Sequence, residues 1–174
     1  MSEKTWIVLA RIEDGDSLFA DDPITADMLR ALVRSYDPSF RRAAVVSGYD
    51  PESGTAGPSH WVGEFSPPLG FVSALSFDGL NLWGEIEEME EDGEGLVAKA
   101  VADGFLQRSI AWWRSLPELR GKPPYLRHVA LLGGEPPGIP NLPALTEYFR
   151  SEIGDMNGRI VASAPYCVRH LFNT

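Results

Sequence analysis

The sequence predicts an α+β domain: a mixed or antiparallel sheet, closed into a β-barrel, with flanking helices. Strand-like runs outnumber helical ones and do not alternate with them in a regular β-α repeat. The chain has 174 residues, of which 44% are hydrophobic, enough for the core of one ordinary domain. Asp78-Gly79, a dipeptide typical of hairpin turns, joins two strand-like runs directly. Together these observations favour a sheet of neighbouring antiparallel strands.

The first elements are a strand and a helix. Residues 5–11 (TWIVLAR) are apolar or β-branched and lead into a run of turn-forming residues, so they predict a strand. Thr25 can cap a helix that ends before Pro38. Its apolar side chains fall on one stripe at helical spacing: Met28, Leu29, Leu32, Val33 and Tyr36.

The middle of the chain predicts strands around a long loop. Residues 43–47 form a short apolar run that indicates a buried strand. Residues 48–70 contain too many prolines and glycines for a long regular element. Residues 71–77 and 80–86 are then the two strands of the hairpin. A loop as long as residues 48–70 in a compact domain is usually functional or mobile.

The later elements are a helix, two strands and a second helix. Residues 95–103 predict a short helix closed by Gly104. Residues 107–113 and 125–132 predict two strands, because each is a short run of mostly apolar residues. A further helix is expected over 143–152.

Charge and composition exclude several partners. The formal net charge is −10, and binding to nucleic acid depends on clustered Lys and Arg, so we expect no nucleic-acid partner. The acidic run at 85–94 indicates a solvated loop or a helix start. No window reaches the roughly 18 apolar residues that a membrane span needs. We therefore expect a cytosolic protein that uses no membrane.

The single cysteine and the three histidines limit the available chemistry. Cys167 cannot form an internal disulfide and has no recognisable catalytic surroundings. The histidines are His60, His128 and His170. Alternation along the strand puts His128 on one face with Leu126, Ala130 and Leu132. Taken alone, such a histidine is usually structural, and a strand serine such as Ser109 is a poor nucleophile without a base.

Four segments, taken in their order along the chain, change this interpretation of Ser109 and His128. They are SYDPSFRRAAVVSGYD, GFVSALSFDGLNLWGEIE, VADGFLQRSIAWW and YLRHVALLGGEPPGIPNLPAL. The set resembles the Mu-like phage prohead (capsid maturation) proteases, with a Tyr-Asp-Pro and short strand, a Gly-aromatic-Val hairpin, a serine strand and a Leu-Arg-His-Val strand. The resemblance covers roughly residues 24–145.

The resemblance implies a fold and a catalytic site. The family is similar in fold to the herpesvirus assembly proteases, which have a β-barrel with flanking helices and a Ser-His-His arrangement. Residue by residue, Ser109 matches the nucleophile and His128 the third catalytic position, and no cofactor is implied. The protease-like domain spans residues 1–145, and 146–174 add a C-terminal helix and tail to the same domain.

The first histidine of the family pattern is replaced in this chain. Where the family has Gly-His-Pro, the sequence reads Gly48-Tyr49-Asp50-Pro51, and tyrosine is an inefficient base at neutral pH. Two alternatives remain: activity is lost, or His60 supplies the base across an insertion. The spacing of His60 from Gly70 resembles that of the family histidine from its own hairpin, so we expect His60 to be the base.

Three hypotheses follow for function. The first is a serine endopeptidase that cleaves scaffold and major capsid precursor proteins inside an assembling procapsid in the host cytoplasm, with a homo-oligomer left open. The second is a catalytically impaired module that binds scaffold or assists capsid assembly. The third is an unrelated β-rich binding domain. Arg108 and Arg127 neighbour the site residues, but alternation assigns neither to an oxyanion hole, and Trp112 and Trp113 are expected to pack.

Overall fold

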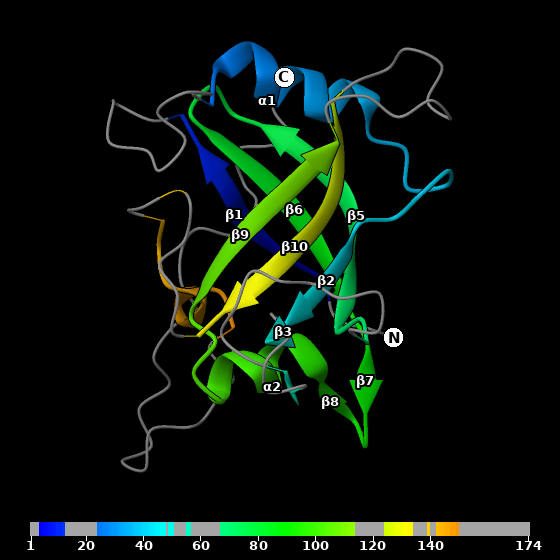
Figure 1. The fold of residues 1–174 in the computed structure, drawn as a ribbon, viewed down its shortest axis with the longest axis vertical. Helices are drawn as coiled ribbons and strands as arrows, with labels where there is room; N and C mark the ends of the chain where they lie inside the picture. The colour runs from blue at the N-terminus through cyan, green and yellow to red at the C-terminus, as the bar shows by residue number, and fades with distance from the viewer. Residues whose placement is uncertain are drawn as a thin grey trace.

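The described part of the protein, seen here as a computed structural model, folds around a curled six-stranded sheet with two α-helices (Figure 1). The structure describes residues 4–12, 24–47, 49–50, 55–56, 67–113, 124–133, 139 and 142–149. The strands of the sheet are β1 (Lys4–Arg11), β2 (Ala44–Ser47), β5 (Gly70–Phe77), β6 (Asn81–Glu88), β9 (Gln107–Trp113) and β10 (Tyr125–Leu132). The predicted α+β class is therefore confirmed.

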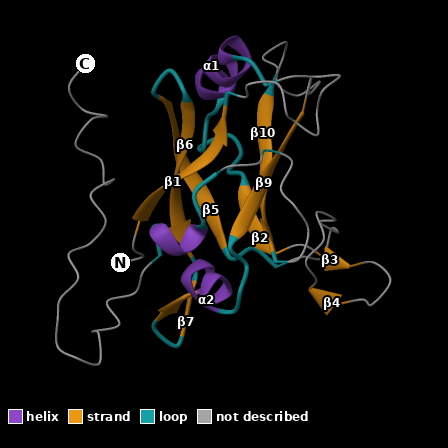
Figure 2. Cartoon of the chain, turned by 90° about the vertical axis from the view of Figure 1, so that its left-hand side faces the viewer, coloured by secondary structure: helices purple, strands orange, loops and turns teal. Residues whose placement is uncertain are grey.

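The sheet has the order β1-β6-β5-β2-β10-β9 and curls into a half-barrel (Figure 2). Every neighbouring pair is antiparallel except β2 and β10, which run parallel. The helices α1 (Ala26–Ser35) and α2 (Leu96–Ala102) lie at opposite ends of the half-barrel. Its two edge strands, β1 and β9, approach each other without pairing in the described sheet. The sheet is thus mixed, one of the two predicted arrangements, but in the described residues it is a half-barrel and is not closed into the predicted barrel.

Helix α1 begins as its sequence predicts. The Thr25 hydroxyl accepts a hydrogen bond from the Met28 backbone N–H at 3.2 Å and so caps the first turn. Leu29 and Leu32 are fully buried on the apolar stripe. Among the described residues, this ten-residue element is the longest helix, and none is long and apolar enough to cross a membrane.

The β5–β6 hairpin turns at the predicted dipeptide. The Asp78 carboxylate accepts the backbone N–H groups of Leu80 and Asn81 at 2.8 and 2.7 Å, and the Trp83 indole N–H at 2.8 Å. Gly79 has a φ of 100°, which a residue with a side chain rarely adopts. The turn therefore fixes the register in which β5 and β6 pair.

The acidic run forms strand rather than the predicted loop or helix start. It completes β6 and continues into a small hairpin of β7 (Glu90–Glu91) and β8 (Glu94–Gly95). Helix α2 begins only after it, and Gly104, with a φ of 103°, follows its end. Glu88 is buried and accepts the Ala98 backbone N–H at 2.9 Å. One carboxylate of the run thus caps the helix, while those of the hairpin tip are exposed.

The segment near the described C-terminal end is not the predicted helix. Only the single 3-10 turn η2 (Leu145–Glu147) forms within residues 142–149, and 150–152 lie outside the described residues. The Leu145 backbone N–H donates to Leu106 O at 2.8 Å. Pro143 O accepts a hydrogen bond from the Arg108 side chain. These long-range contacts fix the segment against α2 and β9 and override its helical propensity.

Candidate functional site

Strands β9 and β10 place Ser109 and His128 on the same face of the sheet. In the antiparallel pair, Ser109 lies opposite Ala130 and His128 lies opposite Ala111. The two residues are therefore diagonal neighbours, a placement whose Cα atoms are about 7–8 Å apart and within reach of a long or aromatic side chain. The structure brings together two of the three residues that the sequence assigned to catalysis.

A β-bulge in β10 sets the direction of His128. The pairing register shifts between Leu126 and His128, so that Leu126 lies opposite Trp112 while His128 lies opposite Ala111. Leu126 consequently belongs to the core, on the other face from His128. The prediction that both share one face was wrong, because strict alternation fails across a bulge. The bulge also leaves the intervening Arg127 exposed.

The face that carries Ser109 and His128 is buried although it lies opposite the core. Ser109 is 5% exposed, and the neighbouring Ala130 and Val46 are 0% and 3% exposed. His128 lies beside Ala44 of the parallel strand β2, and its Nε2 atom is buried. Its direct neighbours across the described strands are thus the small apolar residues Ala44 and Ala111. Within the described part of the chain, no hydrogen bond joins the Ser109 hydroxyl to His128, and Ser109 Oγ is not one of the fully enclosed atoms without a partner.

Arg108 occupies the opposite face from Ser109 and connects the two sheet edges. It is fully buried, and its Nε donates to Val8 O of β1 at 2.7 Å, while Nη1 donates to Pro143 O. Burial lowers the pKa of the Arg108 guanidinium to about 10. Arg108 is therefore a structural bridge across the β1–β9 gap and does not point toward Ser109. Alternation gave its face correctly, but nothing in the sequence indicated its partners.

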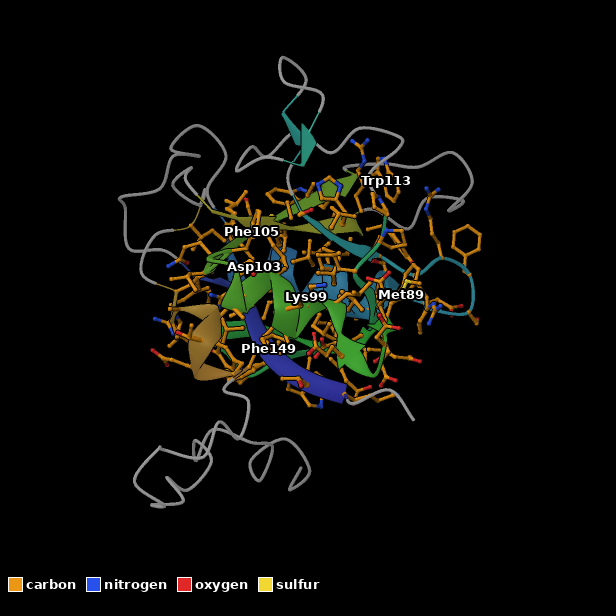
Figure 3. All side chains as sticks on the ribbon, turned by 90° about the horizontal axis from the view of Figure 1, so that it is seen from below. Met89, Lys99, Asp103, Phe105, Trp113 and Phe149 are labelled. Atoms are coloured by element: carbon orange, nitrogen blue, oxygen red, sulfur yellow. The ribbon has the colours of Figure 1, made fainter. Side chains whose placement is uncertain are left out.

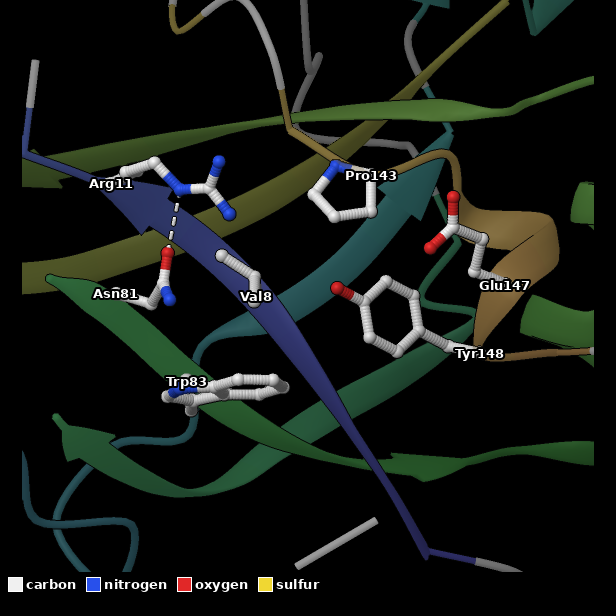
Figure 4. A pocket seen from close by; sticks show the side chains of 7 residues that line it. All are labelled: Val8, Arg11, Asn81, Trp83, Pro143, Glu147 and Tyr148. Carbon is white, nitrogen blue, oxygen red and sulfur yellow. Dashed lines mark hydrogen bonds between the residues drawn. The ribbon is translucent and has the colours of Figure 1, made fainter. Parts of the chain in front are cut away.

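A small pocket lies on the Arg108 side of the molecule, away from the serine. It has a volume of about 170 Å³. Its walls come from β1, β6 and the η2 segment (Figure 4), and its lining residues are Val8, Arg11, Asn81, Trp83, Pro143, Glu147 and Tyr148. Arg11 donates to Asn81 at 2.7 Å, and the Trp83 and Tyr148 rings meet edge-on at 6.4 Å. Neither Ser109 nor His128 lines this pocket.

For the remaining predicted site residues, no side-chain position is described. His60, Cys167 and His170 lie outside the described residues. Tyr49 belongs to the short strand β3 (Tyr49–Asp50), whose backbone pairs with β4 (Thr55–Ala56). The described ranges contain no group of three or more His, Cys, Asp or Glu residues that could hold a metal ion.

No protein-family model, no curated protein and no solved structure matches this chain. The prohead protease resemblance therefore stays a prediction.

Proposed function

We propose that the chain is a serine endopeptidase of the prohead maturation type, with Ser109 as nucleophile. The observation that carries the proposal is the placement of Ser109, a nearly buried serine on the same sheet face as His128. Among the described residues, no hydrogen bond of the Ser109 hydroxyl is found, and its oxygen is not one of the fully enclosed atoms without a partner. A hydroxyl without a structural partner beside an imidazole is available for chemistry.

The proposed reaction is acyl transfer to water. Ser109 Oγ attacks the peptide carbonyl while a histidine takes its proton, and the same proton then goes to the leaving amine. Water hydrolyses the resulting acyl-enzyme and releases the serine. In the Ser-His-His arrangement that the resemblance implies, His128 orients the base and His60 is the base. The substrates would be scaffold and major capsid precursor proteins within a procapsid.

The decisive experiment compares two serine variants in a cleavage assay with scaffold or capsid precursor. Ser109→Ala should abolish cleavage, because the nucleophile is removed. Ser76→Ala is the matched control, since Ser76 lies on β5, opposite Trp83 and away from β9 in the sheet. Full cleavage by Ser109→Ala would show that the nucleophile assignment is wrong.

The base is tested separately. His60→Ala should lose most activity, and His128→Ala should lose activity without unfolding. Full activity of His60→Ala, together with an inactive Ser109→Ala, would remove His60 from the mechanism and leave Ser109 in place.

A second function, a catalytically impaired assembly module, is favoured by Tyr49. This residue stands where the family pattern has its first histidine. In that case no precursor would be cleaved by any variant, while the unmodified chain would still bind scaffold protein in sedimentation experiments.

A further inference from the structure

Two exposed arginines and the exposed Phe40 ring gather around Trp113 at the end of β9. Ser109, Ala111 and Trp113 share one face, because side chains alternate along the strand. Arg41 Cζ lies 4.6 Å from the centroid of the Trp113 ring, and Arg127 Cζ lies 5.7 Å from it. Phe40, 52% exposed, and Trp113 both contact the Tyr125 ring. We call Phe40, Arg41, Trp113 and Arg127 the arginine patch; Figure 3 shows Trp113 on the side of the molecule away from Phe149.

The arginine patch holds two positive charges close together. Because both guanidinium groups lie over one indole ring, their carbons are no more than about 10 Å apart. Both arginines are exposed, and neither forms an ion pair within the described part of the chain. Asp37, the nearest carboxylate in sequence, accepts hydrogen bonds from the Ser39 N–H and O–H. On a chain of net charge −10, this pair of cations favours an anionic partner.

The patch is held in place before any partner binds. The Tyr125 hydroxyl lies 2.6 Å from Arg41 O and 2.8 Å from Asp37 O, and shares its hydrogen between them. It also accepts the Asp37 N–H at 3.3 Å. Arginines that lie over a ring keep the N–H edges of their guanidinium groups available for a carboxylate. A site whose side chains are already ordered loses less entropy when a partner binds.

We propose that the arginine patch binds an acidic segment of the protein substrate, which rests on the proposed protease function. Two arginines match the carboxylates of a short acidic segment, whereas a nucleic acid requires a larger cluster of Lys and Arg to neutralise successive phosphates. The exposed Phe40 ring offers contact to an apolar side chain of the same segment. Ser109 and Trp113 are four residues apart on one strand, or about 13 Å. An extended substrate would therefore carry its acidic residues about four positions from the cleaved bond.

Binding is tested first, without catalysis. A fluorescein-labelled peptide of alternating glutamate and alanine with one phenylalanine is titrated with the Ser109→Ala protein, and its anisotropy is followed. The glutamine counterpart should bind at least about tenfold more weakly. The double variant Arg41→Gln, Arg127→Gln should bind the acidic peptide more weakly than the parent by a similar factor. Arg34→Gln is the matched control, since Arg34 is exposed on α1 and contacts no ring among the described residues.

Equal binding of both peptides, or an equal loss with Arg34→Gln, would overturn the proposal, and so would tighter binding of a single-stranded oligonucleotide. Cleavage is tested next with peptides whose glutamates lie near to or far from a cleavable bond. The double variant should raise KM at least about tenfold for the first kind, with kcat unchanged. Tighter binding of the glutamate peptide without any cleavage would refute the protease function but support the docking site. Cleavage at a rate that does not depend on the glutamates would refute the docking site but support the protease function.

Discussion

The two faces of strand β9 hold polar residues in different surroundings. On the inner face, Arg108 is fully buried and its donors reach Val8 O and Pro143 O. On the outer face, the adjacent Ser109 is almost as buried, yet its hydroxyl makes no hydrogen bond in the described part of the chain. Burial alone therefore does not distinguish these two residues. The number of internal hydrogen bonds does, and under the proposed function it predicts that inner-face changes act on stability and outer-face changes on activity.

The largest expected effect on stability is at Arg108. Arg108→Ala should lower the free energy of unfolding by about 3–5 kcal/mol, because it leaves a cavity and two carbonyl groups without their donor. Urea denaturation of this variant and of Ser109→Ala measures the contrast directly. Ser109→Ala should change stability by less than about 1 kcal/mol. If the two variants were equally unstable, the distinction between the faces would fail.

A smaller effect is expected where the outer face meets the arginine patch. Tyr125→Phe keeps the ring contacts with Tyr36 and Trp113 but removes the hydroxyl that holds Arg41 O. Stability should fall by about 1–2 kcal/mol. Acidic peptide should also bind more weakly, because the loop that carries Arg41 is released. A loss of stability with unchanged peptide binding would mean that this anchor does not order the patch.

The smallest effect lies outside both faces, at the β5–β6 turn. Burial alone would raise the pKa of Asp78, but the hydrogen bonds from Asn81, Trp83 and Leu80 outweigh it and lower the pKa. The carboxylate therefore stabilises the fold above the unfolded pKa, near 4. This contribution is lost as the pH falls through the lower, folded pKa.

Asp78→Ala should accordingly cost about 1 kcal/mol at pH 7 and less in acid. Urea denaturation of both chains over a series of pH values measures the difference. A difference that grew as the pH fell would contradict the direction of the pKa shift.

Much of the sheet could be predicted from local patterns. The bounds of β9 and β10 were predicted as the structure has them, and the Thr25 cap and the turn at Asp78 were correctly placed. These features depend on residues close together in the chain. The helix predicted over 143–152 failed, because that segment bonds to residues about 35 positions away.

The site was predictable only in part. Ser109 and His128 share a face, but their diagonal register depends on a β-bulge that no residue type in the sequence indicates. The arginine patch was missed because Phe40 and Arg41 are distant in sequence from Trp113 and Arg127, and the two tryptophans were both expected to pack. Trp112 does pack against the core, whereas Trp113 lies with the exposed arginines. The role of His60 stays a prediction, since it lies outside the described residues.

The bridge at Arg108 also constrains the order in which the chain can fold. Arg108 and Val8 are 100 residues apart, and the second acceptor, Pro143 O, lies 35 residues further along the chain. Helix α1 and the β5–β6 hairpin involve only short separations and can form early. During synthesis, this part of the β1 edge stays uncovered until Arg108 has emerged, and the bridge is complete only once Pro143 follows. An unpaired edge can pair with another chain, so this interval is when the protein is most exposed to aggregation.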